Sequence, residues 1–589
     1  MGFRRVFDIL LHQAAHYPQK NALSLKKGHR QVVFSTHHCL QIVEELSAGL
    51  LDLGLKKGER AAIFADTGSP EWNFIDLSLQ KIGAIVVPVP AVVSTEDLLF
   101  ILKDSEAKIC FAGSPDLCRR VQAVRASLVH LKYLYALEPV PDMPYWESLR
   151  TLPTEQHLRK FNTYKAVLHE DDWATIVYSN VDGMPRGAWL SHKNLIHNVR
   201  ALIKLYGLNC DQRVAGFTSL GYLPERLLVY AALAVGASVF YGEKGRGNVR
   251  WMGEAKPHFI VSSPRIPEEW IEKKQKKAAD GTTFRQRKTK WAIAVGAQYP
   301  DAGQWTLAYW VKWRMARFLV FRKWRKEWGG SLRGVLVEAG FLPPSRVRLL
   351  TAIGIPVFEF YGPSAAAGLV CANAPGNLKF GTAGKPVPET YIEIQAPQES
   401  GTGQIRIKGP QVAQRLEPPA GENSTSITPD GWLLTKDRGR ITGDGFLEIT
   451  NHDFMGVRAS LGEYVSLQTI EYQLNATPYI AQSLVLGFER PFLSALIVPD
   501  MVRLKARCLS EKIWWTSPRY VVLDPQVRAL FQAVIDEQNK AYPAAWQIQK
   551  FTLLAEGWEE MTTEPTPEWA PSRAGILKKY HKEIDKMYR

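Results

Sequence analysis

The residue types best suited to binding chemistry gather in one stretch, residues 305–328. Five tryptophans are interleaved there with seven Lys and Arg residues and a single Glu, the tryptophans being Trp305, Trp310, Trp313, Trp324 and Trp328. A basic amphipathic helix of this composition suits an anionic membrane surface, where Trp rings lie at headgroup level and Lys or Arg meets lipid phosphate. The alternative is a surface helix whose aromatic side packs on the core. The sequence leaves both interpretations open.

The net charge of the whole chain favours anionic partners too. The sequence has 73 Lys and Arg against 58 Asp and Glu, a formal charge of +15 and a pI of about 9.3. Such an excess favours anionic lipid, nucleic acid or polyanionic small molecules, and the alternative is a solvated basic surface. Because nothing resembles a zinc finger or another basic DNA-reading module, a nucleic-acid partner is not expected.

The cysteines and the N-terminal residues indicate a cytoplasmic protein. Six cysteines are scattered without a Cys-x-x-Cys pair, which predicts reduced thiols and no metal cluster. The start has no apolar run of signal-peptide length, and Val6 stands where a myristoylation signal needs Ser or Thr. No apolar stretch reaches the length of about 18 residues expected of a membrane span. The predicted location is therefore the cytoplasm, peripheral on the inner face of the membrane if 305–328 binds lipid.

An α/β scaffold is expected to position these residues. The 589 residues exceed one hydrophobic core and indicate several domains. Apolar residues at helical spacing predict a helix at 40–51, and the runs at 61–64 and 84–89 predict buried strands. Alternation of this kind, which continues to about residue 370, is typical of α/β architecture.

The pattern changes near residue 380. Short strands are predicted at 391–394 and 404–407, separated by Gly, Pro and Asp turns, and a mixed α and β pattern returns near residue 454. We therefore predict a large N-terminal domain at residues 1–453 and a small C-terminal domain at residues 454–589.

Three polar places are ordinary turns when they are taken alone. Residues 178–187 form a Gly/Pro turn, residues 361–365 follow a buried strand, and Asp437 has the character of a turn-capping aspartate. Motifs elsewhere give these places a second interpretation, because they agree in order and spacing with a known family. They are residues 71–89, 178–187, 190–195, 358–364, 432–439, 444–450 and 491–500.

These motifs resemble the adenylate-forming (AMP-binding) superfamily, and within it the bacterial long-chain acyl-CoA synthetases. The resemblance implies a large N-terminal domain of βαβ-type subdomains with a small β-barrel-like part, followed by a small α+β lid domain. It also implies a reaction in which ATP and Mg²⁺ convert a fatty acid into an acyl-adenylate, which CoA then attacks to give a thioester.

The first implied site is the phosphate loop, a run of Thr, Ser and Gly that ends in Pro-Lys-Gly in the family. Here the stretch is one residue short, and only Ser179 keeps a hydroxyl. Asp182 places a negative charge where phosphate would lie, and Arg186 replaces the lysine. The phosphate-binding candidates are Ser179, Asn180, Asp182, Gly183, Arg186 and Gly187.

The second site corresponds to the family's Tyr-Gly-x-Thr-Glu, whose tyrosine and glycine line the adenine and acyl-adenylate site. Tyr361, Gly362 and Ser364 are retained or similar, whereas Ala365 replaces the glutamate that helps to hold Mg²⁺. Because Mg²⁺ needs oxygen ligands, no metal site is predicted at this position.

The third site is the ribose-binding aspartate, which is kept as Asp437. Lys436 replaces the family's glycine before it, which predicts changed backbone geometry. Further along, the resemblance aligns a family arginine with His452 and the hinge residue with Phe454. The loop near the CoA channel has Leu461 where the family has glycine, and its candidates are Ser460, Leu461, Gly462 and Glu463.

The last implied site is the lysine that drives adenylation, and its position falls on Ala570. Arg573 would substitute for it in another register. The catalytic positions Ala365, His452 and Ala570 are thus all replaced. Our leading hypothesis is a degenerate synthetase homologue that binds a long-chain fatty acid, an acyl thioester or a protein partner, and that does not use ATP or AMP, Mg²⁺ and CoA as the family does. An active ATP-dependent long-chain fatty acid–CoA ligase and an ATP-independent acyl transferase on the same fold remain as alternatives.

Overall fold

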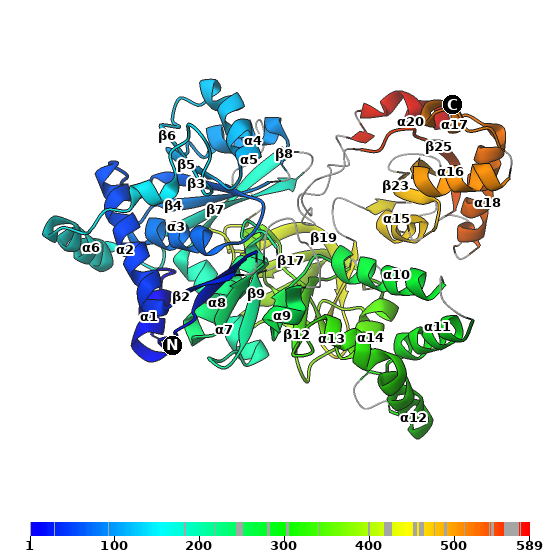
Figure 1. Ribbon diagram of the computed structural model, residues 1–589, viewed down its shortest axis with the longest axis horizontal. Helices are drawn as coiled ribbons and strands as arrows, with labels where there is room; N and C mark the ends of the chain where they lie inside the picture. Colours follow the sequence, from blue (N-terminus) through cyan, green and yellow to red (C-terminus); the bar gives the residue numbers. More distant parts are fainter. Residues whose placement is uncertain are drawn as a thin grey trace.

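A computed structural model describes residues 2–588 except for a set of short segments. The residues outside its description are 29, 92, 182–183, 217, 243–250, 280–282, 302–304, 341, 398–400, 417–426, 452–455, 459–463, 476, 488–491, 512, 541, 543–546, 559–575 and 578. Figure 1 shows a large N-terminal part built on two twisted sheets and a small C-terminal part beside it. This is the α/β architecture of two unequal domains that the sequence predicts.

The first large sheet has seven strands, and its strands β7, β4, β3, β5 and β6 run parallel. Helices α4 (Thr95–Asp104) and α5 (Pro115–Val124) cover one face of it through apolar side chains. In spatial order the strands are β18 (Arg415–Leu416), β8 (Met184–Ser191), β7 (Trp173–Val181), β4 (Ile85–Pro90), β3 (Arg60–Ala65), β5 (Ile109–Ala112) and β6 (Tyr133–Ala136).

The second large sheet has nine strands, of which the central ones are parallel. In spatial order they are β15 (Lys385–Pro386), β14 (Cys371–Ala372), β13 (Val357–Tyr361), β12 (Gly334–Glu338), β11 (Phe259–Val261), β9 (Arg213–Gly216), β10 (Ser238–Tyr241), β1 (Leu23–Lys27) and β2 (Arg30–Phe34). Its outer face packs against a further helical layer: α9 (Met252–Ala255), α10 (Arg265–Ala279), α11 (Thr283–Ala297), α12 (Leu307–Ala316), the π-helical turn η4 (Arg317–Phe321), α13 (Arg322–Glu327) and α14 (Pro344–Ile353).

A layer of helices lies between the two sheets and shares one apolar cluster with both. Its members are α1 (Asp8–His16), α2 (Thr36–Asp52), α3 (Pro70–Lys81), α7 (His192–Tyr206) and α8 (Leu223–Val235), while α6 (Glu155–Val167) lies at the periphery. Helix α8 is buried nearly all round, as expected of a helix between two sheets. The helix predicted at 40–51 and the strands predicted at 61–64 and 84–89 are confirmed as α2, β3 and β4.

A small antiparallel sheet follows the large ones, where the resemblance implied a barrel-like part. It consists of β16 (Tyr391–Gln395), β17 (Gly403–Lys408), β19 (Leu433–Ile441) and β20 (Leu447–Asn451). Strands β16 and β17 confirm the strands predicted at 391–394 and 404–407. The inward side chains of β17 and β19 share a separate apolar cluster with Tyr361 and Val370, so this sheet is fixed to the end of β13.

The C-terminal domain has hydrophobic clusters of its own. A sheet of three strands packs against helices, and a short strand pair precedes it. The elements are β21 (Gly456–Arg458), β22 (Tyr464–Ser466), α15 (Leu467–Asn475), β23 (Ile480–Leu486), β24 (Leu493–Pro499), α16 (Met501–Ser510), α17 (Pro518–Val521), α18 (Pro525–Asn539), β25 (Ile548–Leu553) and α20 (His581–Tyr588). In the described part of the chain, every helix is too short or too polar to cross a bilayer.

A buried ion pair joins the layers at the start of β7. Arg226 on α8 binds Asp76 on α3, and their side chains are 1% and 0% exposed. The Arg226 guanidinium also donates to the Tyr230 hydroxyl (2.6 Å) and to Thr175 Oγ1 on β7 (3.0 Å). Thr175 in turn donates to the carbonyl of Val86 on β4 (2.6 Å). One charge therefore ties two interior helices to the middle of the seven-stranded sheet.

Because Asn is nearly isosteric with Asp, Asp76→Asn leaves the Arg226 charge buried without its counter-charge and opens no cavity. Loss of one partner of a buried pair costs about 3–5 kcal/mol, so we expect a clear drop in the denaturant midpoint of the N-terminal domain. The control is Glu537→Gln, which breaks the exposed Lys540–Glu537 pair and should leave the midpoint unchanged. Equal midpoints for the two variants would contradict this role of the buried pair.

Candidate functional site

The stretch expected to be a phosphate loop is a β-hairpin over most of its length. Strands β7 and β8 pair in the register Ser179 with Arg186, Asn180 with Pro185 and Val181 with Met184. Only Asp182 and Gly183 connect the strands, and Asp-Gly is among the strongest sequence signals for a two-residue hairpin link. The structure thus corrects the expectation of a loop at 178–187, because the stretch is too short to leave the sheet.

The hairpin takes up main-chain donors that a phosphate site would need. In an antiparallel pair, residues at alternate positions exchange N–H···O=C bonds across the ladder, and Pro185 has no N–H at all. A phosphate cradle requires several free N–H groups that converge on one point. Among the described residues of β7 and β8, the ladder turns every second N–H group toward the partner strand and so removes it from such a cradle.

Packing explains Gly187 without a phosphate. A Cβ there would lie 3.2 Å from the Tyr178 ring and 3.0 Å from Ile176 Cγ2. Gly187 therefore lets the Tyr178 ring lie flat on the sheet, and the Tyr178 hydroxyl donates to Asp104 Oδ2 (2.5 Å). Ser179 and Arg186 face each other across the hairpin and are partly exposed.

The second predicted stretch lies at the carboxyl end of β13, against the hairpin. Tyr361 ends the strand, and Ser364 opens a short 3-10 turn, η5 (Ser364–Ala366), that contacts both β7 and β8. A Cβ at Gly362 would lie 2.3 Å from the Leu369 nitrogen, so the close chain approach requires glycine. Ala365 is partly buried and packs on the two neighbouring apolar clusters. Ala365, which the resemblance aligns with the family's metal-binding carboxylate, thus makes apolar contacts.

Helix α7, which begins in the motif at 190–195, positions these segments. Ser191 caps the helix by accepting from the Asn194 N–H (3.3 Å). Asn194 donates to the carbonyls of Pro410 (2.7 Å) and Val412 (3.0 Å). One turn later, Asn198 donates to the Ala367 carbonyl (2.8 Å). Helix α7 thus holds the turn that follows Ser364 and the segment at 410–412 in place.

Tyr361 and Asp437, two candidates that match the family motifs by residue type, bind each other. The Tyr361 hydroxyl donates to Asp437 Oδ2 at 2.6 Å, and the two residues are only 2% and 8% exposed. Burial, together with the adjacent Asp437 carboxylate, raises the pKa of Tyr361 well above its ordinary value, so the phenol stays protonated. Lys436 is exposed and lies in strand β19, where the pairing with β17 shifts register, and the expected change of backbone geometry relative to the family's glycine stays a prediction.

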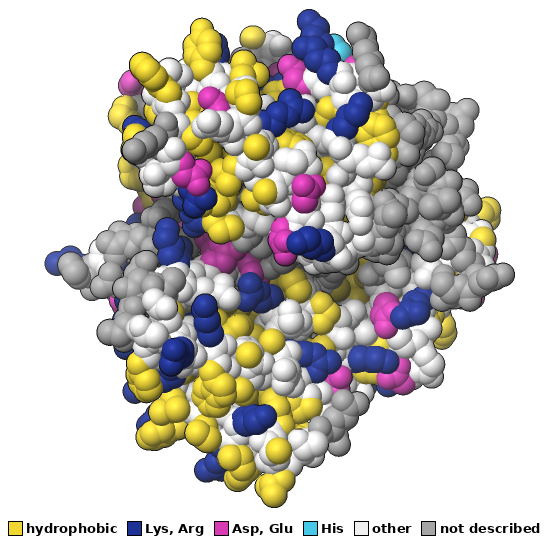
Figure 2. Space-filling view, turned by 90° about the vertical axis from the view of Figure 1, so that its right-hand side faces the viewer, with side chains coloured by type: hydrophobic (Ala, Val, Ile, Leu, Met, Phe, Trp, Pro, Cys, Tyr) yellow, Lys and Arg dark blue, Asp and Glu magenta, His cyan; other side chains and the backbone are white. Residues whose placement is uncertain are grey.

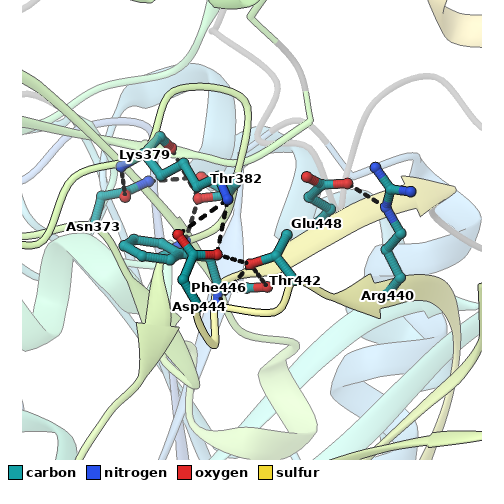
Figure 3. A network of polar contacts seen from close by, with 9 residues as sticks. Asn373, Lys379, Thr382, Arg440, Thr442, Asp444, Phe446 and Glu448 are labelled. Carbon is teal, nitrogen blue, oxygen red and sulfur yellow. Dashed lines mark hydrogen bonds and ion pairs between the residues drawn. The ribbon is translucent and has the colours of Figure 1, made fainter. Parts of the chain in front are cut away.

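A network of polar contacts anchors β19 and β20 beside the site (Figure 3). Lys379 Nζ binds Asp444 at 2.8 and 3.1 Å, and Thr442 Oγ1 donates to the same carboxylate (2.5 Å). These bonds hold the pKa of Asp444 at about 2. Asn373 accepts from the Lys379 N–H (3.0 Å) and donates to the Thr382 carbonyl (2.6 Å). The motif at 444–450 therefore fixes the small sheet that carries Asp437.

Sequence reasoning missed two acidic residues near the ends of β12 and β13. The Tyr222 hydroxyl donates to Glu338 Oε2 (3.1 Å), and Glu338 pairs in register with Phe360, next to Tyr361. Glu359 is 2% exposed, and its Oε2 has no hydrogen-bond partner in the described structure. A signal was present for Glu338, which ends the apolar run of β12, because carboxyl ends of parallel strands commonly carry sites.

Several predicted candidates lie outside the described residues and stay predictions. The side chain of Asn180 belongs with them, although its backbone lies in β7. The others are Asp182, Gly183, His452, Phe454, Ser460, Leu461, Gly462, Glu463, Ala570 and Arg573. Of the described candidates, the structure brings together the hairpin, Ser364, Ala365, Tyr361 and Asp437.

Comparison with known proteins gives matches along nearly the whole chain. A family model described as AMP-binding enzyme matches residues 10–416, and one described as AMP-binding enzyme C-terminal domain matches residues 457–589. The long-chain-fatty-acid–CoA ligase FadD15 of Mycobacterium bovis is 27% identical over 566 residues, covering 93% of this chain and 92% of the relative. The long-chain-fatty-acid–CoA ligase ACSBG2 of Gallus gallus is 24% identical over 628 residues, covering 99% and 81%.

Solved structures share the fold. The anthranilate CoA ligase AuaEII in complex with anthranoyl-AMP has a TM-score of 0.70 at 17% identity, covering 99% of this chain and 98% of that one. The O-succinylbenzoate coenzyme A synthetase MenE from Bacillus subtilis, in complex with ATP and magnesium, has a TM-score of 0.66 at 16% identity, covering 93% and 95%. At 16–17% identity, these matches show a shared fold alone.

Glu359 allows a test of the interior beside the site. Burial raises its pKa from 4.5 to about 8. Because the folded state then holds a proton that the unfolded state has lost, this carboxyl lowers stability as pH rises from about 4.5 to 8, by at most ~1.4 kcal/mol per pH unit. We expect Glu359→Gln to match the wild-type denaturant midpoint near pH 5 and to exceed it near pH 9.

The exposed Glu96 supplies the control, since Glu96→Gln should shift the midpoint equally at both pH values. A Glu359→Gln variant that tracks the wild type across the whole range would show that the carboxyl is ionised and compensated.

Proposed function

The chain belongs to the AMP-binding enzyme family, and on that premise we propose that it is an acyl-CoA synthetase-like protein that binds a long-chain fatty acid or its thioester without forming acyl-adenylates at a useful rate. The family's enzymes work with ATP, Mg²⁺ and CoA. The residues that would bind ATP and Mg²⁺ decide whether this chain can form an acyl-adenylate.

The hairpin at the phosphate-loop position carries the proposal. Its ladder engages alternate main-chain N–H groups of Ser179–Val181 and Met184–Gly187, and Pro185 has none, which leaves fewer donors for a triphosphate. Asp182 adds a negative charge to the link, so phosphate would meet repulsion where the family offers hydroxyls. Arg186 is the one cation of the stretch, and its backbone belongs to β8.

The metal position supports the same conclusion. Ala365 offers a methyl group to an apolar contact where Mg²⁺ would need a carboxylate. In the C-terminal domain, Ala570 replaces the lysine implied for adenylation. Loss of one preorganised charge costs about 10²–10³ in rate, and effects of groups that act as a unit do not add. Adenylation should therefore be slow whichever loss dominates.

Retention of the scaffold supports the acyl part of the proposal. Curated relatives that align over most of the chain are named long-chain-fatty-acid–CoA ligases. Helices α7 and α8, which frame the site, have largely buried side chains, and Ser191 caps the start of α7. We place the protein in the cytoplasm, with peripheral attachment to an anionic membrane. A protein partner, if there is one, would bind the scaffold formed by α7 and α8.

A second candidate is an active ATP-dependent long-chain fatty acid–CoA ligase. The observation that favours it is Asp437, which matches the family's ribose-binding aspartate and lies beside Tyr361. In that case nucleotide must displace the Tyr361 hydroxyl from the carboxylate, and Arg186 or Arg573 must supply the missing cation.

Pyrophosphate exchange separates the two candidates. With fatty acid at saturating ATP and Mg²⁺, we expect exchange at least about a hundredfold below a typical turnover of ~10 s⁻¹. An intact long-chain synthetase run in parallel validates the assay. Exchange within about tenfold of the typical value would establish the active ligase instead.

Restoring the two replaced groups tests the role of the hairpin. We expect Ala365→Glu/Ala570→Lys to remain as inactive as the parent chain, because the shortened link and Asp182 still exclude phosphate. Recovery of exchange by this pair would show that the lost side chains, and not the hairpin, limit the reaction.

Acyl binding is tested without ATP. We expect micromolar dissociation constants for saturated fatty acids from lauric to stearic or for their CoA thioesters, measured by calorimetry and thermal shift. The control ligand is octanoate, whose shorter chain buries less apolar area and should bind more weakly. Absence of both heat and thermal shift with every long ligand would refute the acyl part of the proposal.

A further inference from the structure

The basic aromatic segment divides into an inner and an outer half. Trp324 and Trp328, near its end, are 7% and 0% exposed and pack edge-on against Trp270, each at 5.7 Å between ring centroids. In contrast, α12 stands at the lower edge of the large part in Figure 1, away from both sheets. Residues 324–328 therefore follow the interpretation in which the aromatic side of the segment packs on the core. Helix α12 is considered separately.

Helix α12 is apolar on both faces. On its inner face Ala316 is buried, Trp313 Nε1 donates to the Ala352 carbonyl (3.0 Å), and the Tyr309 hydroxyl donates to the Val295 carbonyl (2.9 Å). The outer face carries Leu307, Val311 and Met315 at four-residue spacing, with 79%, 44% and 51% exposed. A helix that is apolar all round is normally buried. The outer face of α12 is instead exposed, which suggests that a partner covers it.

The outer face continues into η4. Phe318 is 75% and Leu319 45% exposed, while Val320 and Phe321 on the same turn are buried. Trp310, 41% exposed, lies beside them. Figure 2 shows hydrophobic side chains gathered at the lower end of the molecule, in the region of α12, with Lys and Arg side chains among them. Such a contiguous apolar surface, rimmed by polar groups, marks an interaction site.

The charged side chains of residues 305–326 all have one sign. Residues 305–326 contain no Asp or Glu. The exposed cations Lys312, Arg314 and Arg317 flank the apolar row, and the Arg314 guanidinium lies 4.8 Å above the Trp310 ring. Glu327, the acid that ends the segment, turns inward to bind Lys274 and Trp270 Nε1. Protein interfaces place few charges at their centre, whereas an apolar row edged by cations matches lipid tails below phosphate headgroups.

We propose that the outer face of α12 and η4 inserts into the interface of an anionic bilayer. Leu307, Val311, Met315 and Phe318 enter the boundary between headgroups and acyl chains, and the flanking cations bind lipid phosphate. The proposal concerns this surface alone and does not depend on whether the site binds acyl groups or forms adenylates.

Sedimentation with vesicles tests insertion, in the absence of ATP, CoA and fatty acid. The full chain should bind phosphatidylcholine vesicles that contain phosphatidylglycerol, and bind those of phosphatidylcholine alone far more weakly. Leu307→Ser/Phe318→Ser should weaken binding by at least about tenfold, because two exposed apolar groups no longer insert. Lys312→Glu/Arg317→Glu should weaken it by roughly fivefold or more per residue, and high salt should act likewise.

A matched variant controls for general loss of hydrophobic surface. Val129→Ser/Leu152→Ser removes two side chains that are 90% and 77% exposed elsewhere on the molecule, and it should bind vesicles as the wild type does. All three variants change exposed side chains, so each should keep the wild-type thermal midpoint.

Three outcomes would overturn the proposal. They are equal binding by the Leu307→Ser/Phe318→Ser variant, equal binding to neutral and anionic vesicles, and no binding by the wild type. If the wild type ignores vesicles but forms a dimer in analytical ultracentrifugation that the same variant abolishes, the occupant of the surface is a second copy of the chain.

Discussion

The link between β7 and β8 is the constraint on which the candidate site depends. The early part of β7 is fixed in the core, where Thr175 binds both the buried Arg226 guanidinium and the Val86 carbonyl. Its last residue, Val181, pairs with Met184 across a connection of Asp182 and Gly183 alone. We infer that this anchoring and the short connection hinder the hairpin from leaving the sheet to surround a phosphate.

Around this hairpin, buried polar side chains hydrogen-bond to one another. Tyr361 donates to Asp437, Tyr178 to Asp104, and Tyr222 to Glu338. Buried polar groups are costly unless they are hydrogen-bonded, so these contacts stabilise the site. A nucleotide would have to replace each contact with one of at least equal strength. Residues that resemble an ATP site thus bind one another, while the helices beside them, α7 and α8, are largely buried.

The scaffold was predictable from the sequence because its signals are local. The run at 84–89 is buried on both faces as β4, and the helical spacing at 40–51 became α2. The hairpin was missed because the resemblance to a loop outweighed the Asp-Gly signal that the residues themselves carry. Glu338 could not be placed from sequence, since its partner Tyr222 lies 116 residues away. Periodicity also could not decide the Trp-rich segment, because α12 is apolar on both faces and only the packing of Trp313 and Tyr309 shows which one is inward.

The central claim is that this member of the family has lost its phosphate site, and the binding of MgATP to the full chain measures that most directly. Isothermal titration calorimetry requires no turnover and is independent of the acyl substrate. Family enzymes commonly work with substrate constants between about 1 μM and 1 mM. The account predicts no saturable heat up to about 1 mM MgATP, with or without fatty acid. A saturable isotherm with a micromolar dissociation constant and one site per chain would contradict it.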